Sequence, residues 1–376
     1  MKLNIATLSH ALDLAAQIVK SGAHTQPILG HLHFAPDAQG DWYIRATDME
    51  GFIKIRLPLD DDLVPSEPQA PFTLPADKLR ALVKNLPKDQ PLHLQPGAER
   101  TFVLRSGRTR AVLHGLHPDD FPVLDDDGAP LHSLPFNGAE LKQALRAVNS
   151  HQAQGDVRSY LNGTHMHFSR RGLEVVATDG HRLAYIPLAY EWTADDEHSL
   201  VIARDRAANL IHLLPDDDIT LDLYPLRLSV DLPSVGLHYH AKLIDGRYPD
   251  YHRVIPKNYT DAIEIDRDAL LAAVRRVGAL GGKSTAGVFY VTGGTITLSL
   301  KDTQEGSVEE TLDCTPVEGA MDLRIGLSLP YLADVLKAID TPSIHLRARD
   351  PESAILIHPA PKSDMPDHYV IMPMRL

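Results

Sequence analysis

Three pairs of histidines, each with one residue between them, are the side chains best suited to binding a metal. They are His31 and His33, His165 and His167, and His238 and His240. Each pair lies in a strand-like run, where alternate side chains share a face and two imidazoles could jointly ligate zinc. The spacing fixes no carboxylate or third histidine beside any pair. A metal-dependent hydrolase is therefore kept only as an alternative interpretation.

Two other patterns fit catalytic chemistry less well. The segment Gly278–Ser284 is rich in glycine, but a phosphate-binding loop would need glycine where Val277 stands, and it would follow a strand rather than a helix. A glycine turn that ends a helix explains the segment better. Asp179 and His181 could serve a hydrolase, yet no Gly-x-Ser-x-Gly elbow supplies a nucleophile. We expect no catalytic residue, no cofactor and no bound metal.

The C-terminal segment Tyr369–Leu376 is apolar and rich in methionine, whereas chain ends are usually polar and frayed. It can be a final core strand. It can also be the wall of an adaptable groove, because methionine suits surfaces that receive several partners. Both interpretations can hold together.

Charge and composition exclude several classes of protein. The formal net charge is −13, which argues against a protein that coats nucleic acid by bulk attraction. Acidic runs such as Asp216–Asp218 are typical of solvated loops, while basic residues gather in helical stretches. Cys314 is the only cysteine, so no internal disulfide is expected. No segment reaches the roughly 20 apolar residues of a membrane helix, which predicts no membrane contact and a cytoplasmic protein.

Six segments place apolar residues at relative positions 0, 3, 4 and 7, the pattern of a helix with one buried face. They begin at residues 12, 79, 141, 207, 270 and 332, so successive starts lie 62 to 67 residues apart. Between them lie short runs that predict half-buried strands, among them Trp42–Ala46, Phe52–Leu57, Leu173–Ala177 and Thr295–Leu300.

A unit of one helix and a few strands is too small to cover a sheet alone, so we expect two units per domain. The echo of Leu32–Phe34 and Ala46–Asp48 in Met166–Phe168 and Ala177–Asp179 supports this pairing. Turn-forming residues near 125–130 and 256–260 mark the boundaries. The predicted domains are residues 1–128, 129–259 and 260–376.

The segment Ala177–Ala184, Ala-Thr-Asp-Gly-His-Arg-Leu-Ala, resembles the hallmark of bacterial DNA polymerase III beta subunits, the sliding clamps. Further matches run along the whole chain, including Pro27–Gly30, Arg105–Arg108, Asp156–Arg158 and Asp245–Tyr251. The resemblance implies an α+β fold of three similar DNA-clamp domains, each with two helices and two antiparallel sheets. Two chains would close head to tail as a ring with its helices lining the hole.

The resemblance implies a non-catalytic processivity factor of DNA replication, with no cofactor of its own. Its partners would be encircled double-stranded DNA, bound without sequence preference, and a second copy of the chain. They would also include a clamp loader complex, the alpha subunit of DNA polymerase III and other proteins with a clamp-binding motif. Weak basic contacts inside a ring would permit sliding, while an acidic exterior would disfavour unproductive binding.

Family partners insert a short peptide with apolar anchors into a pocket between the second and third domains. Matching the motifs carries this pocket onto Leu161, Thr178, Gly180, His181, Arg182, Leu183, Pro249, Arg253, Val254, Val370, Met372, Pro373, Met374, Arg375 and Leu376. A few buried anchors usually dominate the affinity of such contacts.

The resemblance also implies a DNA-facing set and a subunit contact. The DNA-facing residues would be His24, Lys78, Arg80, Arg158, Tyr160, Arg204 and Arg206. The contact would involve Ala279 and Leu280, with Arg100, Arg105, Arg108 and Arg110 facing Glu305, Glu309 and Glu310 of the other subunit. The sequence departs from the family at DNA-facing positions, where Ala23, Asp77, Asp205, Gly155 and Ser159 stand. A divergent clamp-fold protein that binds peptides without encircling DNA is therefore a second alternative.

Overall fold

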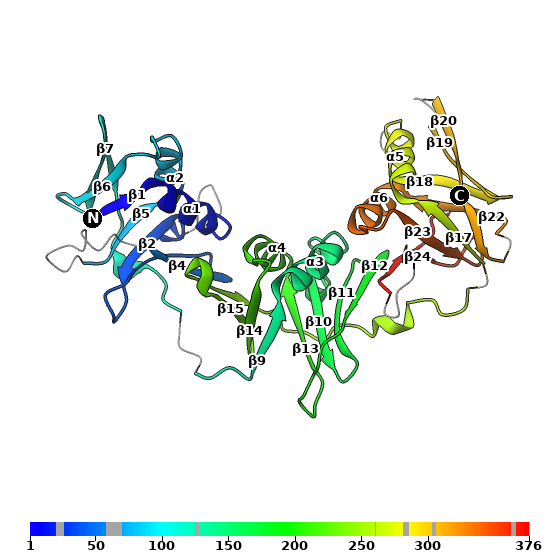
Figure 1. Ribbon diagram of the computed structural model, residues 1–376, viewed down its shortest axis with the longest axis horizontal. Helices are drawn as coiled ribbons and strands as arrows, with labels where there is room; N and C mark the ends of the chain where they lie inside the picture. Colours follow the sequence, from blue (N-terminus) through cyan, green and yellow to red (C-terminus); the bar gives the residue numbers. More distant parts are fainter. Residues whose placement is uncertain are drawn as a thin grey trace. The chain divides into compact units, whose positions relative to one another are not determined.

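The computed structural model describes residues 1–19, 26–57, 70–124, 128–259, 261–280, 286–302, 306–319, 321–361 and 366–375. The chain divides into two compact units. Figure 1 labels the helices and strands that they contain. Unit 1 contains Met1–Leu141 and Ala208–Leu243, and unit 2 contains Lys142–Ala207 and Ile244–Leu376. This division does not test the predicted domain boundaries, which stay predictions. None of the described helices is long and apolar enough to cross a membrane.

All six predicted helices are present in the described ranges. They are α1 Ile5–Ala15, α2 Ala76–Lys84, α3 Gly138–Asn149, α4 Arg204–Leu213, α5 Arg267–Gly278 and α6 Leu329–Ala338. Each begins directly after a strand. Asn4, Asp266 and Ser328 cap α1, α5 and α6, because their side-chain oxygens accept hydrogen bonds from backbone N–H groups of the first turn.

Helix α1 lies earlier in the sequence than predicted. The apolar stripe from Leu12 to Val19 predicted a helix over those residues, but α1 ends at Ala15 and Val19 is buried beyond it. The cap at Asn4 sets the start, and the buried face runs from Ile5 through Leu8 to Leu12. The apolar stripe therefore indicates residues that stay buried beyond the end of the helix.

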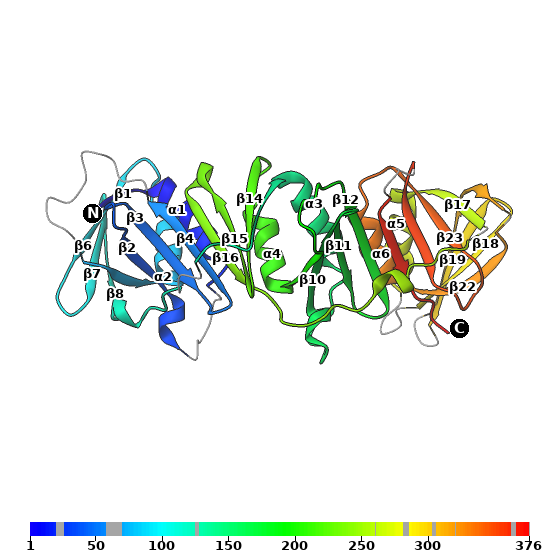
Figure 2. The same cartoon turned by 90° about the horizontal axis from the view of Figure 1, so that it is seen from below.

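Unit 1 contains two antiparallel sheets (Figure 2). The larger has the order β5-β2-β3-β4-β16-β15-β14-β9 and the smaller the order β1-β6-β7-β8. Helix α1 packs on β3, β4 and α2. The strands are β1 Lys2–Asn4, β2 His31–Pro36, β3 Trp42–Thr47, β4 Gly51–Leu57, β5 Phe72–Pro75, β6 Pro91–Pro96, β7 Thr101–Ser106, β8 Thr109–His114, β9 His132–Asn137, β14 Asp218–Tyr224, β15 Arg227–Leu232 and β16 Leu237–Lys242.

Unit 2 repeats this plan with the orders β13-β10-β11-β12-β25-β24-β23-β17-β21 and β20-β19-β18-β22. Helix α5 packs on α6, β17 and β23. The strands are β10 Gly163–Ser169, β11 Gly172–Thr178, β12 Arg182–Leu188, β13 His198–Ala203, β17 Asp261–Asp266, β18 Ala286–Thr292, β19 Thr295–Asp302, β20 Gly306–Asp313, β21 Thr315–Glu318, β22 Leu323–Ser328, β23 Ser343–Ala348, β24 Ile355–Ala360 and β25 His368–Ile371.

One antiparallel pair joins the two halves of each large sheet: β4 with β16 in unit 1, and β12 with β25 in unit 2. The sheets of neighbouring predicted domains therefore merge edge to edge instead of ending separately. Merging removes sheet edges, which are otherwise prone to unwanted pairing.

Two details of the strand predictions are wrong. Strand β11 was expected to be half-buried, yet Val175 and Val176 are both 0% exposed. Val176 packs against Tyr248 and Tyr251, so the segment after β16 covers the second face of the sheet. The sequence echo was also misaligned, because the strand registers make His165, not His167, the counterpart of His33.

Candidate functional site

The Ala-Thr-Asp-Gly-His-Arg motif forms the turn between β11 and β12. Thr178 Oγ1 donates to the Arg182 carbonyl at 2.6 Å and accepts from the Gly180 N–H at 3.1 Å. Asp179 Oδ1 accepts from the N–H groups of His181 and Arg182 at 2.9 and 3.0 Å. Gly180 has a φ of +88°, a conformation that favours glycine. The motif therefore specifies its own turn, because its side chains satisfy the turn's backbone groups.

Arg182 fixes this turn to helix α6. Its side chain is 9% exposed, and its Nε and Nη1 atoms donate to Asp179 at 3.0 Å and Asp334 at 2.8 Å. The guanidinium also lies 4.3 Å from the ring centroid of Tyr331 and donates to the carbonyl of Ser150. A planar guanidinium can serve several acceptors at once, so it holds the turn in one position.

Strand β25 and the start of the C-terminal tail form the facing wall. Val370 lies opposite Leu183 in the register of β12 and β25, and both are buried. The Met372 N–H donates to the His181 carbonyl at 2.9 Å. The side chain of Met372 is 46% exposed, so an adaptable apolar group stands at the rim.

The segment Pro249–Val254 covers the strands and is held by a buried carboxylate. Glu174, 6% exposed, accepts hydrogen bonds from the hydroxyls of Tyr251 and Tyr185. Burial would raise the pKa of Glu174, but these two bonds and the charge of His252 lower it overall. Burial, and then the bond to Glu174, raises the pKa of Tyr251. The phenol therefore remains a donor to an ionised carboxylate.

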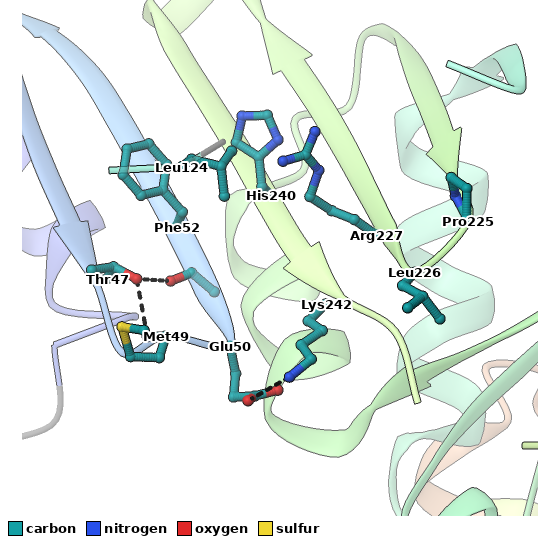
Figure 3. Close-up of a pocket in the computed structure, with 11 residues that line it drawn as sticks. Thr47, Met49, Glu50, Phe52, Leu124, Pro225, Leu226, Arg227, His240 and Lys242 are labelled. Carbon is teal, nitrogen blue, oxygen red and sulfur yellow. Dashed lines mark hydrogen bonds and ion pairs between the residues drawn. The ribbon is translucent and has the colours of Figure 1, made fainter. Parts of the chain in front are cut away.

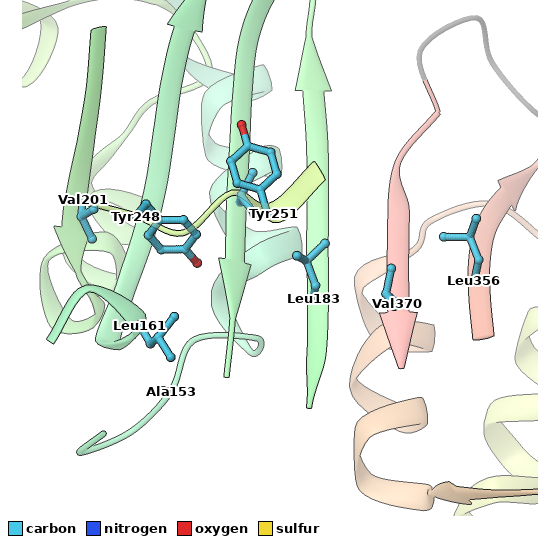
Figure 4. Packing of buried hydrophobic residues seen from close by; sticks show 9 residues of the cluster. Ala153, Leu161, Leu183, Val201, Tyr248, Tyr251, Leu356 and Val370 are labelled. Atoms are coloured by element: carbon cyan, nitrogen blue, oxygen red, sulfur yellow. The ribbon is translucent and has the colours of Figure 1, made fainter. Parts of the chain in front are cut away.

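These elements enclose a cavity of about 180 Å³, which we call the partner pocket. Figure 4 shows the buried cluster beside it, in which Tyr248 and Tyr251 lie over the strands of the sheet. The predicted residues that line the cavity are Leu161, Thr178, Gly180, His181, Arg182, Leu183, Pro249, Val254, Val370 and Met372. Their role as peptide contacts stays a prediction.

Four predicted residues do not line this cavity. The Arg253 side chain is 83% exposed and pairs with Asp250 at 2.9 Å. The Met374 N–H donates to the Gly326 carbonyl at 2.8 Å, so the tail runs toward β22. Pro373 and Arg375 are likewise absent from the lining, and Leu376 lies outside the described residues.

Three lining residues were missed by the motif comparison: Arg158, Asp250 and Tyr251. Arg158 was assigned to DNA, but its guanidinium is held by Asp156 at 2.8 Å at the edge of the pocket. Asp250 and Tyr251 adjoin Pro249 in the sequence. The spacing of the Asp-Gly-Arg-Tyr-Pro-Asp-Tyr motif could therefore have identified them.

The other residues predicted to face DNA occupy varied environments. Lys78 is exposed on α2, and Arg80 on the same helix pairs with Asp13 at 2.7 Å. Arg204 donates to the Gln152 carbonyl at 3.1 Å, and the ring of Tyr160 packs against the cluster beside the partner pocket. His24 and Ala23 lie outside the described residues.

Arg206 is the clear correction within this set. Its position on α4 is 3% exposed, so the side chain is not available to bind phosphate from solvent. The prediction rested on the basic residues of this helix and did not consider which of them lie on its buried face. Arg206 lies one position before buried Ala207, on the side of the helix that packs inward.

The residues predicted at the subunit contact lie on or near two sheet edges. Arg100, Arg105, Arg108 and Arg110 are exposed around the β7–β8 hairpin, where Arg105 and Arg110 are opposite each other. Glu309 is exposed on edge strand β20, whereas Glu310 pairs with Arg276 of its own chain. Ala279 and Leu280 directly follow α5, and Glu305 lies outside the described residues.

The histidines of the three pairs have separate partners: His167 lies 3.2 Å from Glu174 and Glu197, and His238 lies 3.1 Å from Asp231. His33 stacks on Phe121 and His165 on Tyr248, with centroids 5.0 and 4.4 Å apart. Burial is the main reason why the pKa of both imidazoles, His33 and His165, is lowered to about 4. Both imidazoles are therefore neutral at pH 7. Within the described residues, no group of three or more His, Cys, Asp or Glu side chains could hold a metal ion. Helix α5 ends at Gly278, and residues 281–285 lie outside the described ranges, so the glycine turn after the helix stays a prediction.

Known proteins match the chain over nearly its whole length. Family models match in three successive parts: the N-terminal domain of the DNA polymerase III beta subunit at residues 1–125, the central domain at 136–250 and the C-terminal domain at 252–375. The beta sliding clamp of Escherichia coli strain K12 is 34% identical over 362 residues, covering 94% of each chain. That of Pseudomonas putida is 30% identical over 366 residues, covering 97% of this chain and 96% of the relative.

Solved structures agree with the sequence matches. The crystal structure of the DNA polymerase III subunit beta from Pseudomonas aeruginosa has a TM-score of 0.90, 28% sequence identity and full coverage of both chains. The three family matches follow one another in the family's own order and leave only short gaps. The chain belongs to the DNA polymerase III beta subunit family, the bacterial sliding clamps.

Proposed function

We propose that this protein is a DNA sliding clamp, a non-catalytic processivity factor that encircles duplex DNA and tethers DNA polymerase III and other replication proteins. The observation that carries the proposal is the match to beta sliding clamps over 94% of the chain together with the fold. A tether works by topology, so it needs neither a catalytic group nor tight binding to any one DNA site. The protein would act in the bacterial cytoplasm, where the chromosome is replicated.

The partner pocket would bind a short peptide from the polymerase, the clamp loader and other clamp-motif proteins. Its floor is apolar, through Leu161, Leu183 and Val370, and therefore suits buried anchor side chains. The rigid turn at Gly180 gives these anchors a preformed site, which lowers the entropy lost on binding. Val254 and Met372 at the rim are exposed enough to contact a ligand directly.

Two copies would close the ring through sheet edges. Strands β8 and β20 each lie at the edge of a four-stranded sheet, and no other strand of the described ranges pairs with that edge. The arginines of the β7–β8 hairpin complement Glu309 on β20, and opposite charges across strands stabilise pairing. This arrangement is head to tail, because the two edges come from different ends of the chain.

The decisive test is topological. The protein is loaded onto nicked circular DNA by a clamp loader with ATP, and its retention at high salt is measured before and after the circle is linearised. Retention on circles and loss from linear ends is expected for a sliding ring. Salt-labile binding to both forms would overturn it in favour of a clamp-fold peptide binder that does not encircle DNA, an alternative motivated by exposed Asp77 and Asp205.

The partner pocket is tested separately. Val254→Asp and Met372→Asp place charge at an exposed apolar rim without disturbing the buried floor. Each should weaken binding of a fluorescent clamp-motif peptide by at least about tenfold, which corresponds to about 1.4 kcal/mol. Val235→Asp is the matched control, because Val235 is 42% exposed and does not line the pocket. Unchanged affinity in the rim variants would reject the pocket assignment.

A further inference from the structure

Unit 1 contains a second copy of the turn that builds the partner pocket. Thr47 Oγ1 donates to the Gly51 carbonyl at 2.7 Å and accepts from the Met49 N–H at 3.0 Å. Asp48 Oδ1 accepts from the N–H groups of Glu50 and Gly51 at 3.2 and 2.8 Å. Met49 has a φ of +73°, in the region that Gly180 occupies in unit 2. Each of the four hydrogen bonds between the Thr178 and Asp179 side chains and the turn's backbone thus has a counterpart, whereas the Arg182–Asp179 side-chain bond has none because Gly51 stands at the matched position.

The strands beside this turn repeat as well. Phe52 of β4 faces His240 of β16, as Leu183 of β12 faces Val370 of β25. The Lys242 N–H donates to the Glu50 carbonyl at 2.9 Å, the bond that Met372 makes to His181 in unit 2. The register therefore matches the wall positions on β4 and β16 with those on β12 and β25.

The covering segment is repeated too. Phe121 stacks on His33 as Tyr248 stacks on His165. Leu124 follows Phe121 by the same three residues by which Tyr251 follows Tyr248. Leu124 lines a cavity in unit 1, as Tyr251 lines the partner pocket.

This second cavity is the larger of the two, at about 590 Å³, and we call it the basic pocket. Figure 3 shows Phe52 and Leu124 on one side, with Arg227 and His240 projecting from the neighbouring strands. Leu226 at the mouth is 55% exposed. The cavity thus offers apolar surface beside basic side chains.

The chemistry of the wall differs from that of the partner pocket at two matched positions. Where the partner pocket has Val370 and Met372, the basic pocket has His240 and Lys242. Arg227, opposite Lys242 on β15, adds a further cationic group to the basic pocket. Burial, and then the charge of Arg227, lowers the pKa of His240 to about 4, with His238 and Lys54 adding to the effect. Glu50, which pairs with Lys242 at 3.1 Å, is the only acidic side chain among the described lining residues.

We infer that the basic pocket is a second ligand site, for a short acidic peptide that carries an apolar side chain. The apolar side chain would lie against Phe52, Leu124 and Leu226, and a carboxylate would face Arg227 and Lys242. Charge complementarity selects this occupant, because the described lining has two cationic side chains, Arg227 and Lys242, against one acidic side chain, Glu50, in a chain whose net charge is −13. The site is separate from the partner pocket and does not depend on the function proposed for it.

Methionine methyl resonances distinguish the two sites. Met49 lines the basic pocket and is 56% exposed, while Met372 lines the partner pocket. The full-length protein is labelled at methionine methyl groups and titrated with capped hexapeptides that combine two Asp or Glu with two Leu, Met or Phe. The same peptides with Asn and Gln in place of the acids form the comparison set.

The acidic peptides are expected to shift the Met49 signal and leave Met372 in place, with affinity at least tenfold above that of the amide set. Leu226→Glu and Lys242→Gln should each weaken this binding at least tenfold, while Val235→Glu, outside the pocket, should not. Leu226 and Lys242 are exposed, so both variants should fold. No Met49 shift, equal shifts with both peptide sets, or shifts that persist in Leu226→Glu would each overturn the inference.

Discussion

His165 is a buried imidazole on β10 that stacks on an aromatic ring. Its ring lies 4.4 Å from that of Tyr248 at an interplanar angle of 2°. Burial first, and the charge of His167 second, lowers its pKa from 6.5 to about 4. Between these values the unfolded chain binds a proton that the folded chain does not. Stability therefore falls as the pH drops below about 6.5 and levels off below about 4.

Replacing His165 by Phe should remove this acid sensitivity. Between pH 7.5 and 5.5 the parent should lose about 1 kcal/mol of unfolding free energy more than His165→Phe, measured by urea denaturation. The phenyl ring keeps the stacking on Tyr248 but cannot be protonated. The control is His93→Phe, which replaces an exposed histidine. Its unfolding free energy should depend on pH as that of the parent does. Parallel pH curves for parent and His165→Phe would contradict the argument.

Glu174 supports the partner pocket from beneath, through the hydroxyl of Tyr251. Glu174→Gln should lower the unfolding free energy at pH 7 by about 1–3 kcal/mol, because an amide replaces an ionised acceptor in a buried network. It should also weaken clamp-motif peptide binding. The folded pKa lies below the usual 4.5, so this stabilisation is complete above pH 4.5 and is lost as the pH falls through the folded value. Glu191→Gln, at an exposed glutamate, is the control for both measurements.

At the scale of elements, the helices were predictable because their apolar stripes are local and periodic. The sequence did not reveal where α1 ends or which face of α4 carries Arg206, since both depend on packing against distant strands. The Thr178–Arg182 turn was identified through its motif. Tyr251 was missed although it ends the Asp245–Tyr251 motif, because the motif did not reveal its bond to Glu174, 77 residues away in the sequence. The basic pocket was not predicted, because the sequence echo between the two units was aligned two residues out of register.

The joint between β12 and α6 depends on the shape of one guanidinium. Arg182→Lys keeps the charge but cannot reach Asp179, Asp334 and the Ser150 carbonyl together. We expect a loss of about 1–3 kcal/mol in unfolding free energy and weaker peptide binding, because buried acceptors lose their donors. Arg253→Lys is the matched control, since Arg253 is 83% exposed and makes one ion pair. Equal effects of the two substitutions would show that the guanidinium geometry is unimportant.

At the scale of the whole molecule, the proposed function requires an acidic chain to approach both DNA and a second copy of itself. The net charge of −13 disfavours bulk attraction to phosphate, which suits a protein retained on DNA by topology. The same charge would make closure of the proposed dimer depend on local complementarity. In that proposal the arginines of the β7–β8 hairpin would supply it on one edge and Glu309 on the other.

Reversing the charge on one edge should weaken the dimer, and reversing the charge on the other edge as well should restore it. In Arg110→Glu the new carboxylate lies opposite Arg105, so the hairpin gains a favourable cross-strand pair and should stay folded. The altered edge would repel Glu309 of the other copy. We expect the dimer dissociation constant to rise at least about tenfold, which corresponds to a loss of about 1.4 kcal/mol in association free energy. Sedimentation equilibrium measures this constant. Adding Glu309→Arg should recover most of the affinity, whereas Lys257→Glu, exposed elsewhere, should leave it unchanged. If Arg110→Glu dimerises as tightly as the parent, or the second substitution weakens the dimer further, these two edges do not meet in the ring.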